Sequence, residues 1–508
     1  MTTTGGTRAC FLGVDVGTSA CKVIAVDEAG AVVARAVRDY PLSTPRPGWA
    51  EQNPADWWRA TEEAMKALSA ALPAGYAPQA IGLCGQMHGL VPLDGGDRVV
   101  RPAILWCDNR TGAECEELTE ELGGLSRVVE LINNRFLPGY TAGKIVWMRK
   151  HEPKAFEQMR RFLNPKDYIR LKMTGNHATE VADASGTALF DVRHRRWSAP
   201  VLEAVGLRAD QVPPVFESQV TSGKLRAEVA SSWGLPPGLP VVGGGGDGVT
   251  QITSMGIVSE GPVGVIFGTA GVVGGAANRC PDNKDGLLQV FCGNSPDRWN
   301  PMGCTLNGAG SFQWLFDVLS EVPGAKLDFD ALVRVAEAAP AGSDGLLFLP
   351  HLMGERCPQV APEARGALVG LTRAHHLSHL VRGVMEGIVL NIRAVLELIV
   401  RGGVACTEIR ASGGATASPF WMSLLADGLG RDVVTVTGAS EGGAYGAALI
   451  AGVGVGAWSD LERAVAAIQE TTRMKVDPGR AALYQRQLLP HGALFSALEP
   501  IRSMTGPQ

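Results

Sequence analysis

Two short stretches of the same kind constrain this chain more than any other feature. Residues 11–26 and residues 264–273 each contain an apolar strand, a Gly-Thr turn and a second apolar strand. The second stretch begins just after the midpoint of the 508 residues. A repeat so placed indicates two lobes related by duplication, and a chain of this length is too long for one core. We expect domains at residues 1–255 and 256–499, a cleft between them, and a loose tail at residues 500–508.

The two turns have the composition of a phosphate-binding backbone. Thr18 and Ser19 form the first turn, and Thr269 follows Gly268 in the second. Glycine frees backbone N–H groups, and successive amides can hold phosphate oxygens. Asp15, at the end of the first strand, could meet a hydrated Mg²⁺ on those phosphates. Taken alone, an ordinary hairpin capped by Asp and Ser is the simpler interpretation.

A run of four glycines near the middle of the chain leads to a single carboxylate. The run follows the short apolar strand at Val241 and Val242 and ends at Asp247. Glycines allow the backbone to approach a ligand closely, and a carboxylate there can accept a proton from a bound hydroxyl. Glycine runs are more often plain loops, so this stretch alone does not establish catalysis.

The remaining chain alternates helical and strand patterns, which favours an α/β fold. Helical spacing covers residues 54–72, 379–401 and 419–429, and strands are expected at 80–84, 102–106, 409–412 and, as the last strand, 433–436. Polar or glycine-rich loops follow several strands. His88 lies in one of them, where a lone histidine is more often structural than a ligand contact. Gly413 and Gly414 lie in another, where a ribose or a flat ring could rest on the backbone.

The composition excludes several classes of protein. A net charge of −5 argues against nucleic acid as a partner. The ten cysteines form no Cys-x-x-Cys pair, which favours free thiols in a reducing compartment over disulfides or zinc. We find no signal-like segment, and the longest uncharged stretch, residues 444–458, is shorter than the roughly 20 residues of a membrane helix. We therefore expect a cytoplasmic protein without membrane partners.

Several motifs in a fixed order resemble those of the FGGY carbohydrate kinases, over nearly the whole chain. No Gly-x-x-x-x-Gly-Lys-Ser/Thr loop is present, which argues against a P-loop kinase. Residues 139–151 fit one signature of the family and residues 366–386 nearly fit the other, with Gly383 where Ala or Ser is usual. The other motifs that carry the resemblance are Asp15–Ser19, Trp49–Pro54, Gln86–Gly89, Lys144–Trp147, Pro165–Tyr168, Gly245–Asp247, Phe267–Thr269, Gly354–Arg356 and Gly413–Gly414.

The resemblance implies two ribonuclease-H-like (actin-like ATPase) domains and ATP-dependent phosphorylation of a sugar. The N-terminal domain would bind the sugar and carry the base, and the C-terminal domain would bind the nucleotide. Gln86–Gly89 is similar to the xylulokinase branch, which implies transfer to the terminal hydroxyl of D-xylulose. Asp247 would be the base, ionised at neutral pH if its pKa is the ordinary value of about 3.9. The implied contacts are Met87 and His88 for the sugar, Asp15 for Mg²⁺, Thr18, Ser19, Lys22, Gly268 and Thr269 for phosphates, and Gly413, Gly414 and Trp314 for adenosine.

Two departures from the family pattern keep alternatives open. Gly248 stands where the family has Asn, which removes an amide that could hold the sugar. Ala270 stands where the family has Ser, which removes a hydroxyl near the phosphates. Another ketose or polyol, such as ribulose, L-xylulose or an alditol, is thus an alternative substrate. An actin-like ATP-binding switch without sugar chemistry is an alternative of a different class. The expected partner is a small sugar, and a homodimer stays open.

Overall fold

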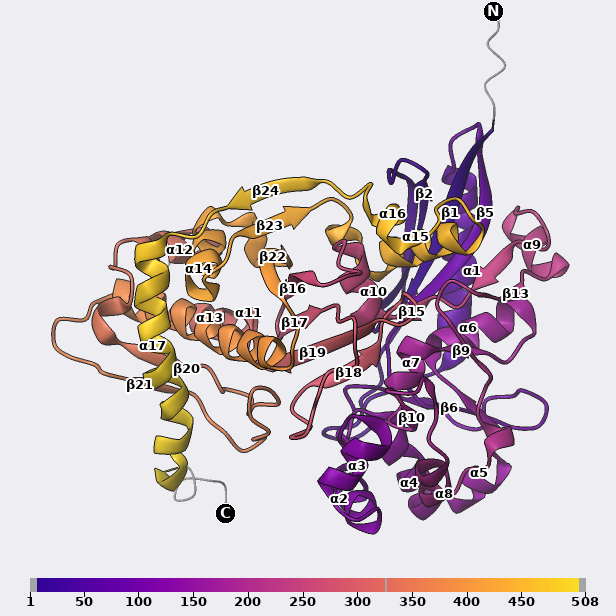
Figure 1. The fold of residues 1–508 in the computed structure, drawn as a ribbon, viewed down its shortest axis with the longest axis horizontal. Coiled ribbons are helices and arrows are strands. Elements are labelled where there is room, and N and C mark those ends of the chain that lie inside the picture. Colours follow the sequence, from indigo (N-terminus) through magenta and orange to yellow (C-terminus); the bar gives the residue numbers. More distant parts are fainter. Residues whose placement is uncertain (1–6, 325–326, 502–508) are drawn as a thin grey trace, which may run out of the picture.

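Two mixed sheets, one in each half of the chain, form the framework of the protein (Figure 1). The computed structural model describes residues 7–324 and 327–501. In the first sheet the strand order is β13-β14-β5-β1-β2-β3, with β15 beside β5. Its strands are β1 (Arg8–Val16), β2 (Ala20–Asp27), β3 (Val32–Asp39), β5 (Tyr76–Gly85), β13 (Thr221–Lys224), β14 (Pro240–Val242) and β15 (Gly245–Gly246).

The second sheet repeats the order of the first. Its order is β18-β19-β17-β16-β22-β23-β24. In each sheet three antiparallel strands, β3-β2-β1 in the first and β19-β17-β16 in the second, continue into two parallel strands and then an antiparallel edge strand. The second sheet has a further antiparallel strand, β18, beside β19. This confirms the predicted two-lobed α/β fold. The strands are β16 (Gly261–Phe267), β17 (Gly271–Gly275), β18 (Gln289–Cys292), β19 (Trp299–Thr305), β22 (Cys406–Ser412), β23 (Val433–Val436) and β24 (Glu470–Met474).

One strand prediction was wrong, because β23 is not the last strand. β24 follows it and pairs with it antiparallel. Four of its five residues are exposed, and its sequence is mostly polar and charged. An edge strand with such a sequence lacks the apolar alternation from which strands are recognised, and the charges protect the edge from other chains.

The long helices lie where their apolar periodicity predicts them. They are α1 (Pro54–Ala71), α13 (Leu377–Arg401) and α14 (Pro419–Leu429). The Asn53 side chain caps α1 by accepting a hydrogen bond from the Ala55 amide. α13 is buried over most of its length and packs against the second sheet through residues such as Ile388 and Ile392.

Two helices join the lobes. α10 (Asp247–Ser254) follows the glycine run, and α15 (Gly443–Gly454) comes from the C-terminal half but packs on β1 and β5 of the first sheet. Figure 1 shows α15 in yellow beside these indigo strands. A Cβ atom at Gly82 would lie 1.9 Å from the Ala447 carbonyl oxygen. Only glycine allows this approach, and the two lobes are therefore packed together through α15.

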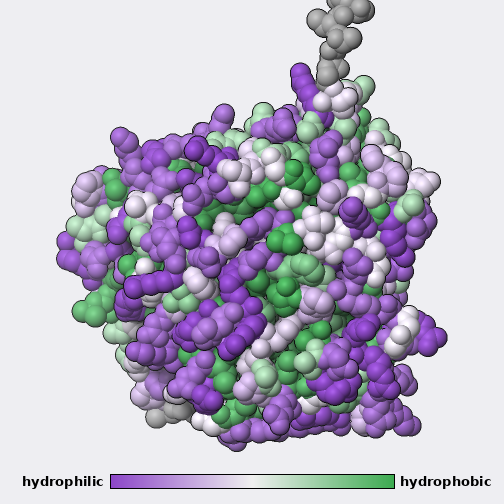
Figure 2. Space-filling view, turned by 45° about the vertical axis from the view of Figure 1, so that its right-hand side comes forward, coloured by the Kyte–Doolittle hydropathy of each residue, from purple (hydrophilic) through white to green (hydrophobic). Residues whose placement is uncertain are grey.

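Smaller helices extend the first lobe, at the lower right of Figure 1. They are α2 (Gly112–Glu121), α3 (Leu125–Ile132), α4 (Thr141–His151), α5 (Pro153–Gln158), α6 (Pro165–Thr174), α7 (Val181–Ser185) and α8 (Ala199–Val205). In Figure 2 hydrophilic residues cover much of the visible face, with hydrophobic patches between them. Within residues 7–324 and 327–501, no helix combines the length and apolarity that crossing a membrane requires. Residues 502–508 of the predicted tail lie outside the described residues.

Candidate active site

The central glycine run is packed backbone that places Asp247 at the first turn of α10. Gly244 has φ +73°, and a Cβ atom there would lie 1.8 Å from the Leu83 carbonyl oxygen. Only glycine fits this left-handed conformation and close approach to β5. The run is therefore a fixed support, and the Asp247 carboxylate is partly buried at its end.

Asp247 lines a cavity of about 220 Å³ together with Met87 and His88. The structure thus brings together the three side chains that the sequence associates with the sugar. Apolar and polar groups complete the wall, as in most small-molecule sites. Further lining residues include Trp106, Tyr140, Gly248, Gln251, Gln289, Phe291, Met302, Cys304 and Arg356.

His88 is held as a neutral imidazole. Its Nδ1–H donates to the Gly186 carbonyl oxygen at 2.5 Å, and its ring stacks on Tyr140 with centroids 4.2 Å apart. Burial lowers the pKa of His88 to about 3. With Nδ1 donating, the other ring nitrogen, Nε2, is left as an acceptor. His88 can therefore accept a hydrogen bond from a ligand hydroxyl.

The loop that carries His88 is braced by a buried lysine. The Lys144 ammonium donates to the His88 carbonyl oxygen at 2.7 Å and to the Gly139 carbonyl oxygen at 2.6 Å. The Thr141 hydroxyl donates to the same His88 oxygen at 3.0 Å. The motif around Lys144 therefore supports the cavity from behind.

The electrostatics of Asp247 differ from the expectation. Burial, followed by the nearby Asp15 carboxylate, raises the pKa of Asp247 to about 7, although the Gly248 and Met87 amides donate to it. The expectation of an ordinary aspartate was wrong, because desolvation and a like charge both disfavour the anion. A carboxyl whose pKa lies near neutrality is well placed to accept and release a proton.

The first Gly-Thr turn is tied directly to this cavity. The Trp106 indole Nε1–H donates to the Thr18 hydroxyl at 2.9 Å, and Trp106 also lines the cavity. Behind the turn, the Gln52 side chain donates to the Thr18 carbonyl oxygen at 2.7 Å, and Gln86 donates to the Gly17 carbonyl oxygen at 3.2 Å. The turn and the loop before His88 therefore form one hydrogen-bonded unit.

Lys22 does not project freely toward a ligand in this structure. Its ammonium lies 3.8 Å from one carboxylate oxygen of Glu441, and the other oxygen of that carboxylate lies 3.1 Å from the Arg35 guanidinium. Lys22 and Arg35 belong to the first lobe and Glu441 to the segment before α15. These ion pairs therefore span the two lobes.

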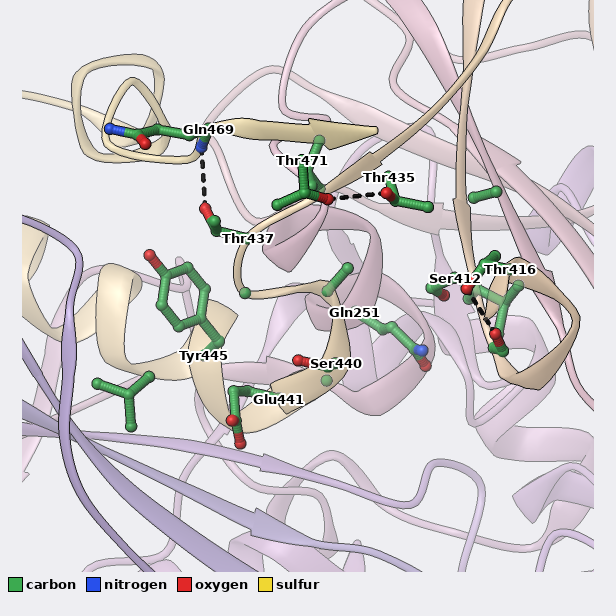
Figure 3. A pocket seen from close by; sticks show the side chains of 18 of the residues that line it. Gln251, Ser412, Thr416, Thr435, Thr437, Ser440, Glu441, Tyr445, Gln469 and Thr471 are labelled. Atoms are coloured by element: carbon green, nitrogen blue, oxygen red, sulfur yellow. Dashed lines mark hydrogen bonds between the residues drawn. The ribbon is translucent and has the colours of Figure 1, made fainter. Parts of the chain in front are cut away.

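Glu441 lines a large cavity of about 1010 Å³ between the lobes (Figure 3). The first lobe contributes residues 29–32 and Arg35 to its wall. The second lobe contributes most of the residues in the ranges 411–417 and 435–442, and some of those in 467–471. Figure 3 shows Thr435 bonded to Thr471 and Thr437 bonded to Gln469 along one side, with Gln251 reaching in from α10. Gly268, Gly413 and Gly414 form part of this wall.

A second, more apolar cavity of about 530 Å³ shares Gly268 and Gly414 with the first. Thr269 also lines it, and aromatic side chains such as Phe312 and Trp421 form its wall. Gly268 and Thr269 are fixed by the start of α11 (Ala309–Ser320), whose Ala309 and Gly310 amides donate to their carbonyl oxygens. A flat aromatic ring fits such a cavity.

Trp314 is not among the residues that line this cavity, in contrast to the expectation. It is 39% exposed and stacks on Phe348 with centroids 6.3 Å apart. Its neighbours Phe312 and Gln313 do line the cavity. Successive residues on a helix point in different directions. The role of Trp314 in binding adenosine stays a prediction, which this cavity does not support.

Asp15 and Asp247 are the carboxylates that could hold a cation. Burial raises the pKa of Asp15, and its charge also acts on Asp247. Mg²⁺ prefers oxygen ligands and is usually held by one or two carboxylates together with phosphates and water. The described residues contain no group of three or more His, Cys, Asp or Glu side chains suited to a metal. The donor set fits Mg²⁺ carried by a nucleotide.

A fully buried cluster of charged side chains lies on α6 and at the start of α7. It lies behind the loop that carries His88 and behind the glycine run that ends at Asp247. The Lys166 ammonium lies 2.6 Å from Asp167, 3.2 Å from Asp183 and 3.6 Å from Glu180. The Glu180 carboxylate caps α7 by accepting from the Ala182 and Asp183 amides. α7 leads to the Gly186 carbonyl that holds His88, so the cluster supports the part of the cavity wall that His88 forms.

Arg170, one turn after Lys166 on α6, supports the other loop. Its guanidinium donates to the Val242 carbonyl oxygen at 2.6 Å and to the Gly243 carbonyl oxygen at 2.5 Å. It also contacts Asp167 at 3.3 Å. The glycine run that ends at Asp247 is therefore anchored to the same charge cluster.

Sequence reasoning missed several lining residues. Trp106 directly precedes the polar end of a predicted strand, which was the available signal. Tyr140 lies inside a recognised signature, and Arg356 ends the recognised Gly354–Arg356 motif, but neither was given a role. Gln251 and Gln289 had no signal, because their proximity to Asp247 arises only from the fold.

Comparisons with known proteins agree with this architecture. Residues 10–256 match the N-terminal domain of the FGGY family of carbohydrate kinases, and residues 263–455 match its C-terminal domain. The xylulose kinase of Escherichia coli K12 is 36% identical over 97% of this chain and 99% of its own. A crystal structure of a "xyloylose kinase" from Brucella ovis is 34% identical, with a TM-score of 0.91 over 97% of this chain and 100% of its own. For xylulose kinase from Rhodospirillum rubrum the identity is 30%, with the same TM-score and coverage. The chain belongs to the FGGY family of carbohydrate kinases.

Proposed function

We propose that this kinase transfers the γ-phosphoryl group of ATP to the terminal hydroxyl of D-xylulose, giving D-xylulose 5-phosphate. The observation that carries the proposal is the cavity in which Asp247 meets Met87 and His88, next to the Thr18 turn. Relatives named xylulose kinase, similar to nearly the whole chain, support D-xylulose as the substrate.

ATP lies between the lobes in this proposal. Its adenine occupies the aromatic cavity beside Phe312 and Trp421, and its ribose passes Gly413 and Gly414. The phosphates contact Thr18, Ser19, Lys22, Gly268 and Thr269. Lys22 then exchanges Glu441 for a phosphate oxygen, since the 3.8 Å pair with Glu441 is a weak one. Mg²⁺, held near Asp15, would neutralise charge on the β- and γ-phosphates.

Asp247 acts as the general base. As the sugar oxygen bonds to the γ-phosphorus and the bond from that phosphorus to the ADP oxygen breaks, the hydroxyl proton passes to the Asp247 carboxylate. The Met87 and Gly248 amides hold the carboxylate in place. Closure of the two lobes excludes water, which would otherwise compete with the sugar hydroxyl.

The raised pKa of Asp247 predicts a pH dependence. Only the deprotonated carboxylate can accept the proton, and burial together with Asp15 places its pKa at about 7. With both substrates well below saturation, the rate constant reports the free enzyme and should rise about tenfold per pH unit below 7, then level off. Asp15→Asn removes the like charge, lowers the pKa of Asp247 and should therefore move the rising part of the pH profile to lower pH. A profile that is flat from pH 5.5 to 8 would contradict the assignment.

Gly248 is the feature that keeps another ketose or a polyol as an alternative substrate. A Cβ atom at this position would lie 3.3 Å from the Met302 methyl carbon, so the space that an Asn side chain would need is partly filled. Met302 and Met87 thus make this part of the wall apolar. A sugar hydroxyl facing Gly248 would lack a side-chain partner there.

A coupled ADP-release assay over a panel of sugars tests the proposed substrate. The panel contains D-xylulose, L-xylulose, D-ribulose, L-ribulose, xylitol, D-arabinitol and glycerol, each at several concentrations. We expect D-xylulose to give the highest kcat/KM. A higher kcat/KM for any other member would reassign the substrate while leaving the kinase reaction in place.

The same proposal places the enzyme in the cytoplasm, the catalytic base in the N-terminal half and most of the nucleotide site in the C-terminal half. All ten cysteines are free thiols, as expected in a reducing compartment. The domain boundary at residues 255 and 256 falls between α10 and β16, where the chain passes from the first lobe to the second sheet.

A further inference from the structure

Arg356 is the only Arg or Lys side chain among the described residues that line the sugar cavity. It comes from the second lobe, whereas Asp247, Met87 and His88 come from the first. Within residues 7–324 and 327–501 its guanidinium has no carboxylate partner at ion-pair distance, although the side chain is partly buried. A cation left without an ion pair in a largely apolar cavity is available to a ligand.

The segment before Arg356 is built to hold it in place. The Glu355 carboxylate is 2% exposed and accepts from the Thr305 hydroxyl at 2.6 Å, the Asn391 amide at 2.8 Å and the Leu306 backbone at 2.9 Å. It also accepts from the Arg356 backbone N–H at 2.8 Å. A hydrogen bond to an ionised acceptor is stronger than a hydrogen bond between two neutral groups. The backbone of Arg356 is therefore anchored to β19 and α13.

The backbone just before this anchor is equally constrained. Gly354 has φ +74°, and a Cβ atom there would lie 2.3 Å from the Pro362 carbonyl oxygen. Glu355 forms two backbone hydrogen bonds with Ala361, at 2.8 and 2.9 Å. The backbone of the recognised Gly354–Arg356 motif is therefore fixed at each position, and the partly buried Arg356 side chain continues from it to the cavity wall.

Arg356 and Asp247 reach this cavity from different lobes. Its charge acts on His88, Tyr140 and Cys304. The groups that act on Asp247 are Asp15 and the Gly248 and Met87 amides. Asp247 marks the hydroxyl that is phosphorylated, which leaves Arg356 available to another part of the same sugar.

We propose that Arg356 binds the α-hydroxyketone end of the sugar, donating to the oxygens on C1 and C2. This inference rests on the proposed function. A guanidinium presents N–H donors in a planar fork that matches two oxygens lying side by side in a plane. The C2 carbonyl oxygen and the C1 hydroxyl of an open-chain ketose form such a pair, whereas an alditol has no planar carbonyl. Arg356 would therefore favour ketoses over alditols.

The test compares D-xylulose with 1-deoxy-D-xylulose, which lacks the C1 hydroxyl. Wild-type enzyme should prefer D-xylulose by tenfold or more in kcat/KM. Arg356→Met should lower kcat/KM for D-xylulose by about 10–100-fold, the range for a hydrogen bond to a charged group, and bring the preference close to one. KM for ATP should stay within about twofold. Arg356→Lys keeps the charge without the fork and should give an intermediate preference.

Arg365→Met is the matched control, because Arg365 lies in the same segment and is exposed. It should leave the preference unchanged. A merely structural defect lowers activity on both sugars together, so an unchanged preference in Arg356→Met would overturn the role of Arg356 alone. A wild-type enzyme inactive on D-xylulose but active on another sugar would overturn the proposed substrate and this inference with it.

Discussion

Asp247→Asn is expected to lower kcat by about 10²–10⁴-fold, the usual contribution of a general base. The amide keeps the size of the carboxyl and the support of the glycine run, but it cannot accept the hydroxyl proton. Sugar and ATP should bind with Kd values within a few-fold of wild type. The measurement is steady-state ADP release, with binding followed by calorimetry.

The variant should not be destabilised. Burial and the Asp15 charge disfavour the Asp247 anion, so a neutral amide removes an unfavourable interaction. We expect an unchanged or higher melting temperature above pH 7, where the native carboxyl is ionised. Asp285→Asn changes an exposed aspartate in the second lobe and serves as the control. Near-normal turnover in Asp247→Asn would remove Asp247 from the mechanism.

Lys166→Met is expected to lower the stability of the first lobe by about 3–5 kcal/mol, the cost of breaking a buried ion pair by removing one partner. Lys166 is fully buried against the carboxylates of Asp167, Glu180 and Asp183. Methionine fills much of the volume but leaves these groups without their central cation. Urea unfolding, followed by tryptophan fluorescence, measures the loss, and Lys224→Met at an exposed position of β13 is the control.

The loss of stability in Lys166→Met should increase as pH rises. Burial already raises the pKa of Glu180 and of Asp183, and removing Lys166 raises them further. The folded state then binds more protons than the unfolded state, so the stability of the variant falls as pH rises above the ordinary carboxyl range. The deficit should be larger at pH 8 than at pH 5. A deficit below about 1 kcal/mol at pH 8 would show that the cluster is not a major support.

The duplicated fold could be predicted because its signals are local. Each lobe begins with a strand, a Gly-Thr turn and a second strand, and these hairpins appear as β1-β2 and β16-β17. The position of α15 on the first sheet could not be predicted. It depends on the close approach of Gly82 to Ala447, and small residues in a helix do not specify which sheet they meet.

The site could be predicted in part, where two recognised short motifs carry its residues. Asp247, Met87 and His88 do line one cavity, as expected. The raised pKa of Asp247 was not predictable, because it depends on burial in the folded protein and on Asp15, which is distant in the chain. Arg356 had no assigned role for the same reason. It reaches the cavity from the second lobe, and no pattern in one segment reports a contact between lobes.

Sugar-dependent ADP release, measured in parallel for wild type and Asp247→Asn, tests the central claim most directly. With ATP and Mg²⁺ saturating, wild type should release one ADP for each D-xylulose consumed, and very little when the sugar is omitted. Asp247→Asn should release little ADP in either case. Equal ADP release by wild type with and without every sugar in the panel would contradict the account and favour an actin-like ATP-binding switch.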